Sequence, residues 1–195
     1  MKPAVPSPVG RVAWKLTVRR ALDVPELLAE PVAAALVALP AEQAARCAVA
    51  EIDPALADTA AFSDYYEVPL HASANCVVVT GKRAGVQRWA GCVVLATARV
   101  DVNGVVRRWL DVRKASFAAQ GEAVEQTLME YGGITPLGLP TGWPVLLDPA
   151  VVLADQVVVG SGVRRSKLLL PGRVLAALPG AEIVEGLGRG GLAGS

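Results

Sequence analysis

The segment richest in potential chemistry is residues 130–144, EYGGITPLGLPTGWP, which lies between apolar stretches typical of helices and strands. Its consecutive glycines, Gly132 and Gly133, allow positive φ angles and let a ligand approach backbone N–H groups closely, while Pro136 and Pro140 stiffen the following turn. Successive backbone donors of this kind form a donor nest. A tight connection that simply needs glycine has the same composition, and the residues alone leave both interpretations open.

A second glycine loop, Gly160-Ser161-Gly162, is followed by the polar run Arg164-Arg165-Ser166-Lys167. It brings hydroxyl groups and positive charges to the end of a predicted strand. A solvated hairpin explains the same residues, so this loop by itself does not predict a site. Ser161, like Thr135 in the first loop, either donates a hydrogen bond in a pocket or satisfies the backbone of its turn.

The sequence offers no clear pair of side-chain nucleophile and base. His71 is the single histidine and lies five residues before Cys76, so in one continuous strand the two side chains would point to opposite faces. We interpret Cys76 as a core residue and His71 as a loop or strand-end residue. With one histidine and three cysteines in apolar surroundings, we expect no metal site, no disulfide framework and no cofactor.

Length and composition predict one folded domain. The chain has 195 residues, of which 53% are hydrophobic and 19% charged, so a sizeable core is available. The net charge of +1 gives no global attraction to DNA or to a membrane. The longest apolar run, residues 32–39, is far shorter than the roughly 20 residues that span a bilayer, and the N-terminus lacks the pattern of a signal peptide. We therefore expect a cytoplasmic protein.

Strand-like and helix-like segments follow one another in a mixed order, which predicts a mixed sheet. Residues 75–80 and 88–97 are β-branched runs joined by GKRAG, and they predict a hairpin. Asp101 can cap a helix whose apolar residues lie on one face, at positions 102, 105, 106, 109 and 110. Further strands are predicted at 46–53, 113–118, 145–148, 156–160 and 166–170. Helices are predicted at 25–39 with a break at Pro31, at 58–66, at 122–128 and after Pro171.

Four blocks of this sequence resemble the YbaK/EbsC family of aminoacyl-tRNA deacylases, which is related to the editing insertion of bacterial prolyl-tRNA synthetase. In chain order the blocks are 73–79 (SANCVVV), 113–116 (RKAS), 132–138 (GGITPLG) and 159–162 (VGSG). The resemblance runs from about residue 46 to residue 187. We expect a single domain over residues 1–195, with residues 1–44 as an N-terminal extension and residues 188–195 as a flexible tail.

The resemblance implies a compact α/β (α+β) fold in which helices surround a mixed, barrel-like sheet. It also implies hydrolysis of the ester between a wrong amino acid and the terminal ribose of a tRNA. In the family, a Gly-x-x-x-Pro loop presents backbone donors to the substrate, and this loop corresponds to Gly132 through Pro136. The family also uses a lysine to hold the phosphate or ribose end of the adenosine. That position corresponds to Asn75, so this chain departs from the family pattern there.

The predicted site has three groups of residues. Gly132 and Gly133 polarise the ester carbonyl, and Asn75 places the ribose. Substrate-binding residues are predicted to be Thr135, Pro136, Gly138, Ser161 and Gly162. Contacts with tRNA phosphates are predicted at Lys114, Arg164, Arg165 and Lys167, with Arg107-Arg108 as a further candidate.

Two functions are compatible with this site. The first is trans-acting editing of an aminoacyl-tRNA that carries a small amino acid such as alanine, serine or cysteine, with an aminoacyl-tRNA synthetase as a further partner. The second is a non-catalytic module that uses the pocket to bind aminoacyl-adenosine, a nucleotide or a synthetase, and Asn75 favours it. Replacing a lysine by an asparagine costs about 1–2 kcal/mol of binding, which is less than the loss of a backbone donor to the reacting carbonyl. We therefore place editing first.

Overall fold

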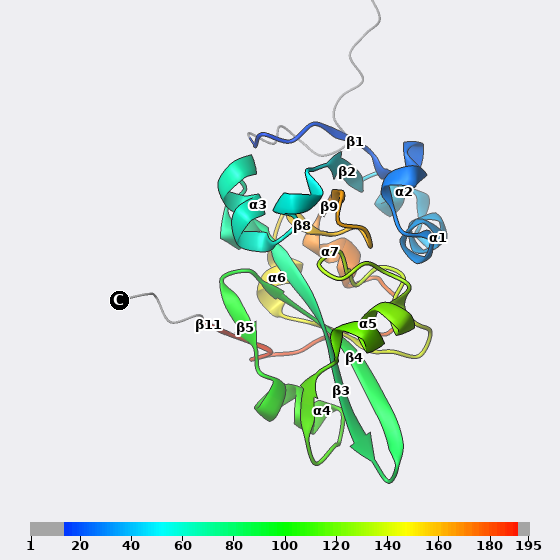
Figure 1. Ribbon diagram of the computed structural model, residues 1–195, viewed down its shortest axis with the longest axis vertical. Helices are drawn as coiled ribbons and strands as arrows, with labels where there is room; N and C mark the ends of the chain where they lie inside the picture. Colours follow the sequence, from blue (N-terminus) through cyan, green and yellow to red (C-terminus); the bar gives the residue numbers. More distant parts are fainter. Residues whose placement is uncertain (1–13, 191–195) are drawn as a thin grey trace, which may run out of the picture.

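The computed structural model describes residues 14–190 and contains three β-sheets with helices packed around them (Figure 1). The strand orders are β1-β2-β9-β8, β10-β7-β4-β3-β6 and β11-β5. Strand β7 runs parallel to β4 and β10 while the other pairs are antiparallel, so the predicted mixed α/β fold is confirmed. Within the described residues the two larger sheets are open, and an isolated parallel bridge joins Ser73, the residue before β3, to Val158 of β8.

The first sheet consists of β1 (Val18–Arg20), β2 (Ala48–Glu51), β8 (Val157–Gly160) and β9 (Ser166–Leu170). All five residues of β9 are buried, and its side chains alternate between two hydrophobic clusters. Leu168 and Leu170 pack in the cluster that contains Leu36, whereas Leu169 packs in the cluster that contains Phe62. Lys167 shares the face of Leu169, so β9 directs an ammonium group toward Phe62.

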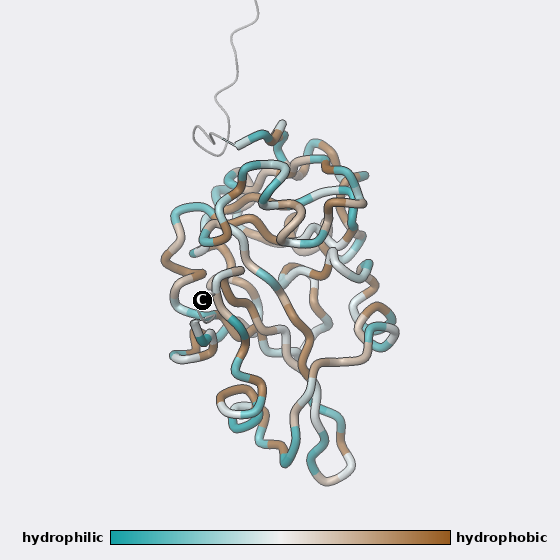
Figure 2. Tube along the Cα trace, turned by 60° about the vertical axis from the view of Figure 1, so that its left-hand side comes forward, coloured by the Kyte–Doolittle hydropathy of each residue, from teal (hydrophilic) through white to brown (hydrophobic). Residues whose placement is uncertain are grey.

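The second sheet is built on the hairpin of β3 (Ala74–Arg83) and β4 (Val86–Leu95). The turn is shorter than the predicted GKRAG connection, because Gly81, Lys82 and Arg83 continue the strand and Ala84 and Gly85 alone turn, both with positive φ. The hairpin extends away from the body of the protein, and its tip is hydrophilic (Figures 1 and 2). The remaining strands of this sheet are β6 (Ala115–Phe117), β7 (Val145–Leu147) and β10 (Ala181–Ile183).

The helices begin where local signals predict. Helix α1 (Glu30–Ala38) has Pro31 in its first turn, and Pro25–Leu27 forms a separate 3-10 turn, as the break at Pro31 indicates. The carboxylate of Asp101 accepts hydrogen bonds from the N–H groups of Gly104 and Val105 and so caps the helical turns Val102–Val106 and α4 (Arg107–Trp109). The other helices are α2 (Ala41–Ala44), α3 (Thr59–Tyr66), α5 (Gln120–Thr127), α6 (Pro149–Leu153) and α7 (Gly172–Leu175). Short 3-10 turns cover Ala21–Asp23, Pro54–Leu56 and Leu70–Ala72.

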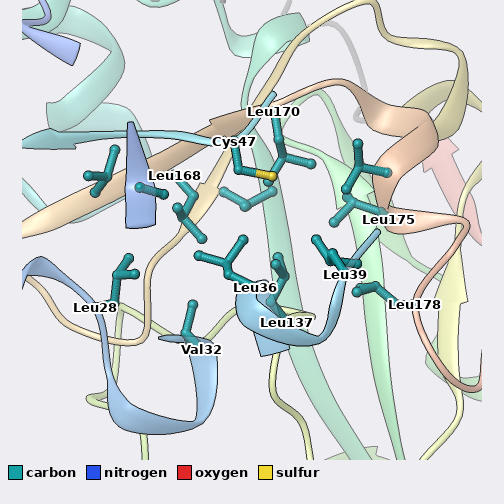
Figure 3. Close-up of a cluster of buried hydrophobic side chains, with 14 of the residues drawn as sticks. Leu28, Val32, Leu36, Leu39, Cys47, Leu137, Leu168, Leu170, Leu175 and Leu178 are labelled. Carbon is teal, nitrogen blue, oxygen red and sulfur yellow. The ribbon is translucent and has the colours of Figure 1, made fainter. Parts of the chain in front are cut away.

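The N-terminal segment is part of the main hydrophobic core. Leu28, Val32 and Leu36 are buried in one cluster with Leu168 of β9 (Figure 3). Residues 21–39 therefore pack into the body of the protein. The sequence alone does not show how this part of the N-terminal extension packs. The fully buried Leu137 belongs to the same cluster and lies in the loop of residues 130–144, which we call the glycine loop. This loop is therefore anchored in the core.

The C-terminal tail begins later than we predicted from the sequence. Gly188–Gly190 form strand β11, which pairs with β5 (Ala98–Val100), and the N–H of Gly188 donates to the carboxylate of Asp148 at 2.8 Å. Arg189 forms an ion pair of 2.6 Å with Asp101. Strand pairing, a hydrogen bond and an ion pair with residues far away in the sequence hold residues 188–190 in place. The local, glycine-rich composition does not reveal such partners. Residues 191–195 of the predicted tail lie outside the described residues.

Candidate active site

A pocket of about 490 Å³ lies where the two larger sheets meet. Strands β3 and β8 supply apolar walls, and the first turn of α3, the glycine loop and β9 complete the lining. The polar lining residues come from segments far apart in the sequence and are Asp58, Thr59, Ser73, Asn75, Gly132 and Lys167. The structure thus brings Gly132, Asn75 and Lys167 together in one pocket. From the sequence we predicted a different role for each: polarising the ester carbonyl, placing the ribose and contacting a tRNA phosphate.

Gly132 presents its backbone to the pocket. It has a φ of 83°, a left-handed conformation that favours glycine. A Cβ atom there would displace the Nη1 atom of Arg164, so a side chain at this position would strain the backbone and move the guanidinium group. Within residues 14–190 the N–H of Gly132 has no hydrogen-bond acceptor. It is therefore a backbone donor available to a ligand.

Gly133 has a different role from the one predicted. Its N–H donates to the carbonyl of Glu130 at 2.9 Å, and its carbonyl accepts from Gly162 at 2.8 Å. Both polar groups are thus used to fold the loop against the Gly160–Gly162 segment. Gly160 is required for the same contact, because a Cβ atom there would collide with the carbonyl oxygens of Gly133 and Ile134. The predicted two-amide nest is corrected to a single free amide at Gly132.

Asn75 lies in the pocket on β3, opposite Val94 of β4. Its Oδ1 atom accepts a hydrogen bond of 2.6 Å from the hydroxyl of Thr59, the first residue of α3. This bond orients the side-chain amide, and the Nδ2 group has no acceptor in the described part of the chain. Asn75 can therefore donate to an oxygen atom of a ligand, and Thr59 positions it.

Lys167 is the cation inside the pocket, although the sequence suggested a surface contact with tRNA. Its side chain enters beneath α3, and the Nζ atom donates to the carbonyl of Ala57 at 2.8 Å and lies 5.5 Å from the centre of the Phe62 ring. The residue is 8% exposed. The pKa of Lys167 is lowered to about 8, mainly by burial and also by the positive charge of Arg164, while the carboxylate of Asp58 opposes both effects.

Arg164 connects the glycine loop to the start of α3. Its guanidinium group donates to the carbonyl of Tyr131 at 3.2 Å and to the carbonyl of Pro54 at 3.1 Å. Its Nη1 atom is 3.9 Å from a carboxylate oxygen of Asp58. Arg164 therefore holds the loop next to Gly132 and adds a positive charge to the mouth of the pocket.

The five residues predicted to bind substrate do not line this pocket. Thr135 and Ser161 are fully buried, and the hydroxyl of Ser161 bonds to Ser166 at 2.7 Å. Gly162, with a φ of 86°, packs against Ala29 of the N-terminal segment. Pro136 and Gly138 lie on the opposite side of the glycine loop, where they line a second cavity. These five residues stabilise the loops next to the pocket, because the loops pack on each other and on the core.

The other predicted tRNA contacts lie outside the pocket. Lys114 is exposed just before β6, where its carbonyl packs beside Gly81 of the hairpin. Arg165 is exposed, but its guanidinium group bonds to the carbonyl of Glu26. Arg107 and Arg108 begin helix α4, and Arg107 donates to the carbonyl of Asn103 at 2.8 Å.

The described residues give the site neither a reactive thiol nor a histidine base. Cys76 lines the pocket, but burial raises the pKa of its thiol to about 12, which keeps it protonated at neutral pH. His71 is exposed in the Leu70–Ala72 turn and is not among the residues that line the pocket. In residues 14–190, moreover, no cluster of three or more His, Cys, Asp or Glu residues could hold a metal ion.

The low acidity of Cys76 has a measurable consequence. A rise of the thiol pKa from 9.0 to about 12 reduces the thiolate fraction, so we expect iodoacetamide to modify Cys76 roughly a thousandfold more slowly than an ordinary cysteine. Mass spectrometry of the peptide that contains Cys76, in the folded and the urea-unfolded protein at neutral pH, measures this ratio. Equal rates in the two states would contradict the buried, protonated thiol.

Sequence reasoning missed Thr59, Phe62, Phe117 and Tyr131, which all line the pocket. Thr59 and Phe62 belong to α3, whose amphipathic pattern is equally typical of a purely structural helix. Phe117 and Tyr131 are 60% and 54% exposed. Two exposed aromatic side chains at one pocket form a surface on which a nucleobase can stack. Phe117 lies in a strand and Tyr131 in a loop, and the local sequence around each does not indicate that the two line one pocket.

Taken together, the structure defines an α/β domain with a pocket lined by the backbone of Gly132, the side-chain amide of Asn75 and the buried Lys167. The profile of the family described as "Aminoacyl-tRNA editing domain" matches residues 53–178, more than half of the chain, and the protein belongs to this family. The match confirms the YbaK-type resemblance, over a narrower range than the 46–187 estimated from the four blocks. A comparison with curated proteins gave no match.

Solved structures share the fold. One, described as "a putative trans-editing enzyme for prolyl tRNA synthetase", is 22% identical with a TM-score of 0.68 and covers 83% of this chain and 97% of its own. A scaffold protein for computational epitope grafting is 20% identical with a TM-score of 0.68 over the same shares of the chains. Hypothetical protein APE2540 is 18% identical with a TM-score of 0.64 and covers 72% of this chain and 90% of its own. The helices within residues 14–190 include none that could cross a membrane.

Proposed function

We propose that the protein is a trans-acting aminoacyl-tRNA deacylase that hydrolyses the ester of a small, wrongly attached amino acid. Membership of the editing-domain family supports the reaction class. The observation that carries the proposal is the free N–H of Gly132 at a pocket whose other polar residues include the donors Asn75, Thr59 and Lys167, beside Asp58 and Ser73. This set of donors suits a neutral ester carbonyl, a ribose and a phosphate.

In the proposed mechanism, the N–H of Gly132 donates to the ester carbonyl oxygen and stabilises the negative charge that develops there. A water molecule attacks the carbonyl carbon, and the bond from this carbon to the ribose oxygen breaks. The ribose oxygen takes a proton that originates from the water and leaves as a hydroxyl group. Asn75, oriented by Thr59, donates through Nδ2 to a ribose hydroxyl and holds the ester against the loop. The reaction needs no side-chain nucleophile, which agrees with the protonated thiol of Cys76.

The pocket walls favour a small amino acid. Side chains of Ala118, Ala123, Val158 and Val159 form apolar walls, and a pocket of about 490 Å³ must hold the terminal adenosine as well as the aminoacyl group. A bulky side chain is excluded by contact, whereas one methylene group contributes only about 1–3 kcal/mol to discrimination. We therefore expect alanine, serine or cysteine esters to be substrates, with the adenine stacked against Tyr131 or Phe117.

Beyond the pocket, the proposal places tRNA over exposed cations. Lys114 and Arg165 are exposed and available for salt-dependent contacts with phosphates, and Arg164 lies at the pocket mouth. A prolyl-tRNA synthetase is proposed as a further partner because it appears in the description of one structural neighbour. The proposed site of action is the cytoplasm, where charged tRNA is available.

The test is hydrolysis of tRNAs charged with alanine, serine, cysteine, threonine and proline by the purified protein. We expect turnover of one or two esters of small amino acids and slower turnover of the bulkier ones. Folded protein that leaves all five esters intact, beside an active control deacylase, would overturn the proposal.

The second candidate is a module that binds aminoacyl-adenosine or a nucleotide without turnover. It is favoured by the neutral side chain of Asn75 at the position of the family lysine. Binding of a non-hydrolysable aminoacyl-adenosine, measured by calorimetry, separates the two functions when combined with the hydrolysis assay. Tight binding without hydrolysis of any ester supports the binding module, whereas binding with hydrolysis supports the enzyme.

A further inference from the structure

Lys167 carries a buried charge whose partner is missing from the chain itself. Its ammonium group has three N–H donors, and one of them is used by the carbonyl of Ala57. Within residues 14–190, no carboxylate oxygen comes within 4.0 Å of the Nζ atom. A buried cation without an anionic partner is costly, and proteins keep such groups where a ligand completes the pairing. Lys167 also lines the pocket, where a ligand could reach its ammonium group.

The groups that face Lys167 come from several elements packed around it. Phe62 of α3 contributes its ring, and β3 contributes the neutral side chains of Asn75 and Cys76. Arg164, from the loop between β8 and β9, adds a second cation. Asp58 is the acidic group that acts on Lys167, and its side chain is 78% exposed. The carboxylate of Glu130 accepts a hydrogen bond from the backbone N–H of Arg164 at 2.6 Å. Neither carboxylate forms an ion pair with Lys167, so its ammonium charge has no anionic partner among the described residues.

The N-terminus of helix α3 adds backbone donors next to Lys167. The Ala57 carbonyl that accepts from Lys167 lies two residues before the first residue of this eight-residue helix. Asp58 occupies the N-cap position, but its side chain does not cap the helix. The N–H groups of Thr59, Ala60 and Ala61 have no acceptor among the described residues. The positive end of the α3 dipole and these donors therefore lie beside the unpaired ammonium group.

We propose that Lys167, the N-terminus of α3 and the guanidinium group of Arg164 form a phosphate-binding subsite at the pocket. A helix N-terminus combined with cations is a common way to bind phosphate, because backbone donors and positive charge act on the same oxygens. Under the proposed function, the ligand group is the phosphodiester that precedes the terminal adenosine of the tRNA. The positive charge that anchors the substrate then comes from Lys167 on β9, a strand of a different sheet from β3, which carries Asn75.

The test compares adenosine with two ligands that carry a phosphate on its 5′ oxygen. Calorimetric titration at about pH 7 with adenosine, adenosine 5′-monophosphate and the dinucleotide CpA measures the contribution of the phosphate. We expect CpA to bind about ten- to a hundredfold more tightly than adenosine. The variant Lys167→Met should lose this advantage and retain the affinity for adenosine. The matched control Lys82→Met removes a charge from the exposed hairpin and should keep the advantage.

A measurement on the wild-type protein makes the test independent of how the variant folds. Deprotonation of Lys167 removes the charge that the phosphate needs, so the advantage of CpA over adenosine should fall as the pH rises above about 8, by up to tenfold per pH unit. The shift of the thermal unfolding midpoint by each ligand, measured at about pH 7 and pH 9.5, reports this change. A titration with inorganic phosphate distinguishes two kinds of site. At a general anion site, phosphate without a nucleoside raises the unfolding midpoint, whereas a subsite that needs the nucleoside gives no shift with phosphate.

Two results would overturn the subsite: equal binding of adenosine and CpA by the wild-type protein, including no binding of either, or an undiminished CpA advantage in folded Lys167→Met. The outcome is separate from that of the deacylation assay. A CpA advantage that depends on Lys167 in a protein that hydrolyses no ester supports the subsite and contradicts the enzyme. Ester hydrolysis without any CpA advantage supports the enzyme and contradicts the subsite.

Discussion

Replacing Gly132 by alanine should lower the rate of ester hydrolysis by about a hundred- to a thousandfold, the range observed when one donor to a reacting carbonyl is removed. The φ of 83° is unfavourable for alanine, and the new Cβ atom would displace the guanidinium group of Arg164. Relief of the backbone strain would rotate the free N–H away from the pocket, and displacement of Arg164 would loosen the loop that presents it. Single-turnover hydrolysis of the best substrate from the panel, by wild-type and variant protein, measures the effect.

Gly142 provides the matched control for this substitution. Its φ is 86°, and a Cβ atom there would have no neighbour within 4 Å. Gly142→Ala therefore introduces the same backbone strain in the same loop without a collision, and hydrolysis should stay within about threefold of wild type. If both variants lost activity equally, general strain in the loop would explain the result and the N–H of Gly132 would have no special role.

Replacing Leu137 by alanine should lower the free energy of unfolding by about 2–5 kcal/mol, as expected for a leucine deleted from a packed core. Leu137 is fully buried in the cluster that contains Leu36 and Leu168 (Figure 3). It is also the apolar anchor of the loop that presents Gly132. We therefore expect hydrolysis to fall as well at temperatures where the variant is still folded. Urea denaturation and the hydrolysis assay measure the two effects separately.

Leu153 is the control for the loss of leucine atoms, because its side chain is 81% exposed at the end of α6. Leu153→Ala should change the free energy of unfolding by no more than about 0.5 kcal/mol. A Leu137→Ala variant as stable as Leu153→Ala would contradict the packing of the glycine loop into the core. A stable, inactive Leu137→Ala variant would separate the positioning of the loop from the stability of the fold.

The resemblance places Asn75 at the position of the family lysine, and under the proposed function the pocket supplies hydrogen bonding and positive charge from two different residues. Asn75 keeps a hydrogen-bonding role through its Nδ2 group, and Thr59 fixes its orientation. The positive charge enters the same pocket from Lys167 on β9. A charge acts over several ångströms, whereas a hydrogen bond needs defined geometry, so the two contributions can come from different strands.

Local sequence determined the elements whose signals are short-range. The hairpin follows from two β-branched runs with a glycine turn, the start of α1 follows from Pro31, and the cap of Val102–Val106 follows from Asp101. Each depends on residues within a few positions of one another, which is the range over which turn, proline and capping preferences act. The four family blocks likewise identified the editing-domain family.

The tertiary structure alone decided which predicted residues meet in the pocket. Gly133 appeared equivalent to Gly132 in the sequence, but Glu130 and Gly162 occupy its polar groups. Lys167 resembled its exposed neighbour Arg165 in a polar run, but strand alternation turns it inward to a carbonyl 110 residues away. Such partners depend on how distant segments pack, and the composition of a short segment contains no information about them. The sequence by itself thus determined the elements with short-range signals and the family, whereas long-range packing brought one amide, one asparagine and one lysine together in the pocket.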